Sequence, residues 1–159
     1  NNPVFNKLTN DLISLRFTQK IMEQVNERYL KISGQTQQVS VELYKVLSQH
    51  PKLDQFMKDR LLNFVSAMYS TANDLLDCSN NIERLCRLKM MVSEITQINN
   101  LMLMCFQLGM LSSDMCIDYG QKLEFVKIDL KVLVDLQDEQ VKKDLKIDTD
   151  DDQLNWDDF

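Results

Sequence analysis

The sequence predicts an all-α protein: an antiparallel up-down-up-down four-helix bundle with an extra N-terminal helical segment and an acidic C-terminal tail. Three observations support this fold class. Apolar residues recur at three- and four-residue steps through most of the 159 residues, which is the spacing of amphipathic helices. Only three Gly and two Pro are available for turns. No run of β-branched residues alternates with polar residues as a strand would.

The first predicted helix covers residues 6–32. A polar Ser33-Gly34-Gln35-Thr36 segment then interrupts its apolar pattern, and a glycine inside a helix costs about 1 kcal/mol relative to alanine. We therefore expect a kink or a break at this segment, followed by a helix over residues 37–49. Pro51 marks the end of that helix, because proline disfavours helical geometry in the residue before it.

The next helix is predicted over residues 52–77. Its apolar side is expected to contain Phe56, Met57, Leu61, Phe64, Val65, Met68, Ala72, Leu75 and Leu76. Asn80 followed by Glu83 resembles a capping box, which predicts the start of the following helix at residue 81.

The last two helices are predicted over residues 81–108 and 113–137. Gly109 between them can adopt the left-handed conformation that ends a helix, and Ser112 or Ser113 can cap the next one. A link this short makes neighbouring helices antiparallel. The last helix can continue towards Leu145, where apolar residues become sparse.

The chain divides into an N-terminal extension at 1–36, a bundle at 37–147 and an acidic tail at 148–159. The tail contains six Asp and no Lys or Arg; removing those six from the 24 acidic residues leaves 18, equal to the 18 Lys and Arg. The bundle is thus neutral overall, and its charge neither favours nor excludes a nucleic-acid partner.

No pattern of catalytic or cofactor-binding residues is found, so we expect a non-enzymatic protein without a cofactor. His50 is the only histidine and no CxxC pair occurs, which disfavours a zinc site. Asp148, Asp150 and Asp152 alternate as in a calcium loop, but Gln153 and Phe159 replace the required Gly and Glu.

Cysteine usage and hydropathy favour a reducing, cytoplasmic setting without a membrane partner. No signal peptide and no apolar run of membrane-spanning length is present. Cys105 and Cys116 flank Gly109 at similar distances in the sequence. They can approach each other, although reduced thiols packed as small apolar residues are the favoured interpretation.

Three groups of residues are candidates for binding surfaces. Basic side chains on the second and third bundle helices could contact phosphates, although a solvated face is the commoner meaning of such groups: Lys52, Lys58, Arg60, Arg84, Arg87 and Lys89. Aromatic and apolar residues within the acidic tail could dock on a basic groove: Leu154, Trp156, Asp157, Asp158 and Phe159. Leu101, Leu103 and Met104 lie outside the apolar stripe of their helix and favour an oligomer contact or cover from the N-terminal helix.

Residues 40–135 resemble a bacterial four-helix-bundle family. It includes the accessory variability protein (Avd) of diversity-generating retroelements and proteins encoded in intervening sequences of large-subunit ribosomal RNA genes. The matching features, in chain order, are Leu43-Tyr44, Pro51-Lys52, Ala72-Asn73, Leu108-Gly109-Met110-Leu111-Ser112 and Tyr119. The chain departs from the family at Leu103, where Arg is common, and at Lys131–Val134, where the family often ends its last helix with Gly-Gly-Trp.

The resemblance implies an oligomeric bundle and, in the retroelement members, a basic surface that binds nucleic acid and a reverse transcriptase. The expected function is thus an accessory protein that binds RNA or DNA and a protein partner. The alternative is a helical protein–protein adaptor that docks through an apolar helix face and the tail. A secreted helical cytokine also matches the size and helix count, but the absent glycosylation sequons and the Met-rich core disfavour it.

Overall fold

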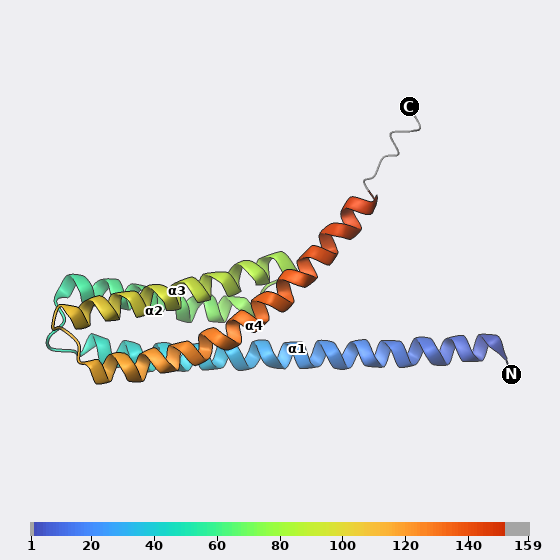
Figure 1. The fold of residues 1–159 in the computed structure, drawn as a ribbon. Helices are drawn as coiled ribbons and strands as arrows, with labels where there is room; N and C mark the ends of the chain where they lie inside the picture. The colour runs from blue at the N-terminus through green and yellow to red at the C-terminus, as the bar shows by residue number, and fades with distance from the viewer. Residues whose placement is uncertain (1, 152–159) are drawn as a thin grey trace, which may run out of the picture. The chain divides into compact units, whose positions relative to one another are not determined.

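The computed structural model describes residues 2–151 and contains four α-helices there, with no strand. In chain order they are α1 (Pro3–Ser48), α2 (Gln55–Leu75), α3 (Asn81–Gln107) and α4 (Ser113–Asp151) (Figure 1). The all-α fold class is confirmed. The chain divides into two compact units between Lys31 and Ile32. The described part of the first unit contains only the N-terminal part of α1, and the second unit is the four-helix bundle.

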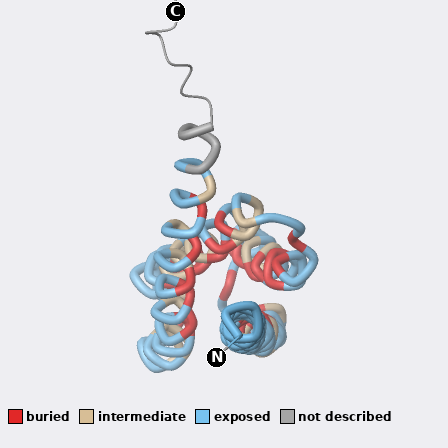
Figure 2. Tube along the Cα trace, turned by 90° about the vertical axis from the view of Figure 1, so that its right-hand side faces the viewer, coloured by how far each residue is buried: buried red, intermediate tan, exposed pale blue. Residues whose placement is uncertain are grey.

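The core of the bundle is formed by one apolar stripe from each helix. Leu43 and Leu47 of α1 are completely buried, and the following helices bury residues at steps of three and four. Figure 2 shows these buried residues on the sides of the bundle helices that face one another. The largest buried side chains of α2 to α4 include Leu61, Met68, Leu75, Leu88, Met91, Ile95, Ile98, Met102 and Leu123. These positions follow the 3.6-residue period of the sequence, so the helical pattern alone determines most of the core.

Local capping interactions determine where α2, α3 and α4 begin. The side chain of Asp54 accepts a hydrogen bond from the Met57 N–H at 2.8 Å, and Asn80 accepts from the Glu83 N–H at 2.8 Å. The Glu83 carboxylate in turn accepts from the backbone N–H of Ser79 at 3.1 Å, which lowers the pKa of Glu83. Ser112 caps α4 by accepting from the Met115 N–H. The predicted caps at Asn80 and Ser112 are confirmed.

The α3–α4 turn also follows the prediction. Gly109 has a φ of 75°, the left-handed conformation that ends a helix. The N–H groups of Met110 and Leu111 both donate to the Cys105 carbonyl, at 2.8 and 3.3 Å. These bonds satisfy a carbonyl at the end of α3 and reverse the chain within a few residues.

The expected break at residues 33–36 is wrong, because α1 is helical without interruption from Pro3 to Ser48. Of the residues that suggested a break, Ser33 and Thr36 are buried and hydrogen-bonded. Ser33 Oγ donates to the Ala72 carbonyl of α2 at 2.6 Å, while Thr36 and Ser40 donate to carbonyls one turn earlier in α1. Small hydroxyl side chains thus let α1 and α2 approach closely without an unpaired polar group in the core.

Helix α4 is longer than the predicted 113–137, since it continues to Asp151. Val141 is buried at 9% exposure, and Asn81 Nδ2 donates to Asp144 Oδ2 at 2.8 Å. These contacts extend the packing of α4 beyond the apolar pattern that the sequence shows. The predicted tail therefore begins inside a helix, and residues 152–159 lie outside the described part of the chain.

Replacing Gly34 with alanine is expected to stabilise the protein. Gly34 is exposed and helical, and an added Cβ would meet nothing within 4 Å. The variant should gain about 1 kcal/mol in the free energy of unfolding, measured by urea denaturation. Gly109→Ala is the matched control, because its positive φ should make the same substitution destabilising. Equal effects at the two positions would contradict this assignment.

Candidate functional site

The six candidate basic residues form two separate groups. Lys52 lies in the α1–α2 turn, and Lys58 and Arg60 lie in the first turns of α2, whereas Arg84, Arg87 and Lys89 lie near the start of α3. Because α2 and α3 are antiparallel neighbours, their starts are at opposite ends of the bundle. The rise of 1.5 Å per residue separates the two groups by about 25 Å. The six basic residues that were predicted as one phosphate-binding group therefore lie at two ends of the bundle.

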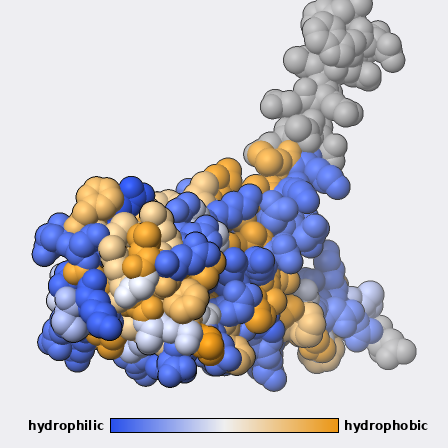
Figure 3. Space-filling view, turned by 60° about the vertical axis from the view of Figure 1, so that its left-hand side comes forward, coloured by the Kyte–Doolittle hydropathy of each residue, from blue (hydrophilic) through white to orange (hydrophobic). Residues whose placement is uncertain are grey.

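The first basic group is accompanied by an exposed aromatic ring. Phe56 was predicted on the apolar side of its helix, but it is 68% exposed. The Arg60 guanidinium lies over its ring at 5.9 Å from the centroid, a weak cation–π contact at an exposed site. The end of the bundle that carries the α1–α2 and α3–α4 turns is brought forward in Figure 3, which shows apolar and hydrophilic residues interleaved there.

The second basic group is partly engaged in holding the α2–α3 turn. Arg84 donates to Asn81 Oδ1 at 3.0 Å and to the Cys78 carbonyl at 3.4 Å. Arg87 is half-buried, and Lys89 is exposed. Loss of Arg84 would therefore disturb the turn as well as any bound phosphate, so this group is a poor starting point for mutagenesis.

The other two candidate surfaces are the apolar residues of α3 and the residues of the acidic tail. Leu103 and Met104 are about half exposed, and Leu101 is partly buried, so α3 does present apolar side chains outside the core. The tail candidates Leu154, Trp156, Asp157, Asp158 and Phe159 lie outside the described residues.

Helix α4 carries an apolar surface that the sequence analysis missed, here named the α4 outer stripe. Its members are 49–69% exposed and recur at three- and four-residue steps apart from one polar position at Gln121. They are Ile117, Phe125, Ile128, Val132 and Leu136. The core residues Leu123, Val126 and Leu130 occupy the opposite side of the helix, because successive residues are 100° apart. The helical spacing of these five residues is visible in the sequence and could have identified the second stripe.

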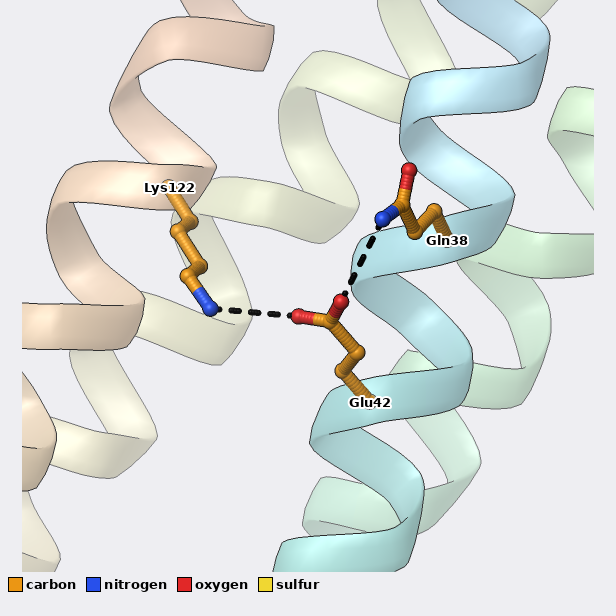
Figure 4. A network of polar contacts seen from close by, with 3 residues as sticks. All are labelled: Gln38, Glu42 and Lys122. Carbon is orange, nitrogen blue, oxygen red and sulfur yellow. Dashed lines mark hydrogen bonds and ion pairs between the residues drawn. The ribbon is translucent and has the colours of Figure 1, made fainter.

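A groove of about 480 Å³ lies between α1 and α4 within the bundle. Its side chains come from Gln35, Gln38, Val39 and Glu42 on α1 and from Lys122, Phe125, Val126 and Asp129 on α4. Lys122 Nζ pairs with Glu42 Oε2 at 3.2 Å, and Gln38 donates to the other oxygen of Glu42 at 3.4 Å (Figure 4). The hydrogen bond from Lys122 lowers the pKa of Glu42. Both charges are exposed, so this pair adds little stability and mainly orients the two helices.

Glu94 of α3 is an ionisable group at the α2–α3 contact. Its Oε1 lies 2.8 Å from Thr71 Oγ1, which also lies 2.9 Å from the Ala67 carbonyl. Its Oε2 is buried without a hydrogen-bond partner. Burial raises the pKa of Glu94, and the hydrogen bond with Thr71 opposes this only in part. Because the Thr71 hydroxyl has one proton, it can donate to Glu94 Oε1 or to the Ala67 carbonyl, but not to both at once.

The four cysteines are free thiols. Cys105 is buried, and the Sγ of Cys116 lies 3.5 Å from the Met102 carbonyl. Burial raises the pKa of both thiols, which makes them less reactive. Packing as small apolar side chains agrees with this geometry.

Within residues 2–151 no group of side chains is arranged to hold a metal ion. None of the described helices is both long enough and apolar enough to cross a membrane.

Comparison with solved structures finds a protein of similar fold. A crystal structure of a protein of unknown function from the S23 ribosomal protein family of Bacteroides thetaiotaomicron VPI-5482 has a TM-score of 0.54 and 12% sequence identity. The match covers 71% of this chain and 96% of that chain. No protein-family model and no curated protein matches the sequence. At 12% identity the likeness shows the fold alone, and membership in the family of the accessory variability protein stays a prediction.

Replacing Glu94 with glutamine is expected to change how stability depends on pH. Because the folded state raises the pKa of Glu94, the native protein binds more protons than the unfolded chain above pH 4.5, the ordinary value for this group. Glu94 therefore contributes a fall in stability as pH rises through this region, opposite in sign to the contributions of Glu42 and Glu83, whose pKa values are lowered. Glu94→Gln removes that fall and should be more stable at pH 7 by about 1 kcal/mol.

The measurement is urea denaturation from pH 4 to pH 8. Glu124→Gln, on an exposed position of α4, is the control and should leave the pH dependence unchanged. Parallel curves for wild type and Glu94→Gln would show that Glu94 is not the responsible group.

Proposed function

We propose that this protein is a non-enzymatic helical adaptor that binds a protein partner through the α4 outer stripe. The observation that carries this proposal is the pair of opposite apolar faces on α4. One face supplies the bundle core, while the other exposes five large apolar side chains, four of them at consecutive steps from Phe125 to Leu136. A contiguous exposed apolar surface on a folded protein is typical of an interaction site.

The chemistry of the α4 outer stripe defines the kind of partner. The stripe spans 19 residue steps from Ile117 to Leu136, or about 29 Å of helix. Phe125 near its centre is the most exposed member and would act as the anchor in a pocket of the partner. Charged residues such as Glu124 and Lys131 flank the stripe and form a polar rim. This pattern suits an apolar groove or an amphipathic helix on another protein.

A nucleic-acid-binding accessory role is the second candidate. It is favoured by the cluster of Lys52, Lys58 and Arg60 beside the exposed Phe56 ring, since basic side chains with an aromatic face bind single strands. The name of the structurally similar protein's family, which refers to a ribosomal protein, agrees with an RNA partner. In this role the protein would act with a reverse transcriptase, as the resemblance implies, in the cytoplasm and as a homo-oligomer. The acidic tail remains an additional docking segment within the adaptor proposal.

Polar substitutions in the α4 outer stripe are expected to abolish partner capture. The Phe125→Ser/Val132→Ser variant removes two exposed apolar side chains, so folding should change little. Tagged wild-type protein should capture a partner protein from a lysate of the source cells. The amount captured by the variant should be at least tenfold lower, measured by quantitative mass spectrometry. Ile82→Ser/Met90→Ser, which alters exposed apolar residues of α3 outside its predicted contact surface, is the matched control. Identical retained proteins for wild type and the α4 variant would contradict the adaptor proposal.

Charge reversal tests the second candidate. The Lys52→Glu/Lys58→Glu/Arg60→Glu variant should lose at least tenfold in affinity for labelled single-stranded RNA or DNA, and its salt dependence should become shallower because fewer counterions are released. The control reverses Lys127, Lys131 and Lys143, three charges of α4 away from Phe56. The affinities are measured by fluorescence anisotropy at salt concentrations from 50 to 300 mM. Equal affinity for wild type and the first variant would exclude this phosphate surface.

A further inference from the structure

The N-terminal part of α1 carries large apolar side chains that the described chain leaves uncovered. Nine of them are between 58% and 67% exposed: Val4, Phe5, Leu8, Leu12, Ile13, Leu15, Phe17, Met22 and Leu30. An isolated helix with such a surface is marginally stable in water, because helices depend on packing of their apolar side. The apolar side of this segment therefore requires a binding partner to cover it.

Five of these residues, together with two polar ones, follow a seven-residue repeat. Phe5, Leu12, Gln19 and Asn26 occupy the first position of successive heptads, and Leu8, Leu15 and Met22 occupy the fourth position. These seven residues are all exposed and are named the arm seam. A repeat of 3.5 residues sustained over more than three heptads is typical of a left-handed coiled coil.

The two polar members of the arm seam identify the occupant as a second copy of this chain in parallel orientation. In a parallel pair, Gln19 meets Gln19 and Asn26 meets Asn26, so each buried amide finds an amide partner. The antiparallel pair that overlaps the same heptads sets Gln19 against Leu15 and Asn26 against Leu8, which leaves the amides unpaired. A buried Asn at the first heptad position is a known determinant of parallel two-stranded pairing.

The charges beside the arm seam agree with the same arrangement. In a parallel pair, the seventh heptad position of one helix faces the fifth position of the next heptad on the other helix. Asp11 and Arg16 occupy these positions, so the pair forms two opposite-charge contacts related by symmetry. The antiparallel pair would instead place Arg16 opposite Arg16.

We propose that residues 4–26 of α1 form a parallel two-stranded coiled coil with a second copy of this chain, in a register set by Gln19 and Asn26. The exposed apolar residues would bury on the order of 1,200 Å² in the pair, the lower range of a stable interface. This inference goes beyond the proposed function. It uses a different surface from the α4 outer stripe and does not depend on the identity of a partner.

A second row of exposed apolar residues provides the matched control. Ile13, Phe17 and Ile21 are 45–67% exposed and lie outside the arm seam. A two-stranded coiled coil leaves them free, whereas a lipid surface or a larger helical assembly would bury them as well. Substitutions in the two rows therefore separate these occupants.

The first experiment measures the mass of the full chain by light scattering coupled to size-exclusion chromatography. Wild type should have an even number of copies. Leu12→Ser/Leu15→Ser should halve the mass, while Ile13→Ser/Phe17→Ser should leave it unchanged. A monomeric wild type, an unchanged mass for the seam variant, or equal loss for both variants would overturn the proposal. Monomers that sediment with phosphatidylglycerol vesicles would assign the arm to a lipid surface instead.

The second experiment tests orientation and register. Gln19→Cys places a thiol in the arm seam, and Asn10→Cys places one on the outer side of the same helix. Mild oxidation should convert at least half of Gln19→Cys into covalent dimers, well above the background of the native cysteines seen with Asn10→Cys. Equal crosslinking in both variants would overturn the parallel register. A loss of partner capture by the α4 variants would not alter either result, so the two proposals fail separately.

Discussion

A helix in a four-helix bundle can bury only one side against its neighbours, and this constraint governs both the fold and the surfaces of this protein. Leu88, Ile95 and Ile98 of α3 show the constraint fulfilled, since they are completely buried at helical spacing. Helix α4 and the N-terminal part of α1 carry more apolar residues than such packing can cover. The excess appears as the α4 outer stripe and the arm seam. The side chains of both surfaces are exposed.

The interior of the bundle is specified by hydroxyl groups as well as by apolar side chains. Ser33, Thr36 and Ser40 are buried, and each donates to a backbone carbonyl. Ser33 bonds α1 to the Ala72 carbonyl of α2, whereas Thr36 and Ser40 bond to carbonyls of α1 itself. Glu94 is the exception, because one of its oxygens is buried without a partner. That arrangement couples protonation of Glu94 to the α2–α3 contact through Thr71, and it makes the contact sensitive to pH.

Features that depend on neighbouring residues in the sequence could be predicted, whereas features that depend on tertiary contacts could not. The cap at Asn80 and the left-handed turn at Gly109 follow from a few adjacent residues, and both are observed. Continuity of α1 through Gly34 depends on carbonyls that accept the buried hydroxyls, one of them from α2. Exposure of Phe56 likewise depends on where α2 starts relative to the other helices. The separation of the basic groups follows from the antiparallel arrangement, although only their order along the chain is visible in the sequence.

The two exposed apolar surfaces differ in period, and the difference indicates different kinds of partner. The arm seam repeats every 3.5 residues, so it stays on one side only when two helices supercoil. From Phe125 to Leu136 the α4 outer stripe steps by three, four and four, an average above 3.6 that does not support a left-handed coil. Such a stripe suits a short contact with a groove or a crossing helix. The arm also contains Gln19 and Asn26, which favour an identical partner, whereas the members of the α4 outer stripe are all apolar and accept any complementary surface. Self-association through α1 and recognition of another protein through α4 are therefore compatible in one molecule.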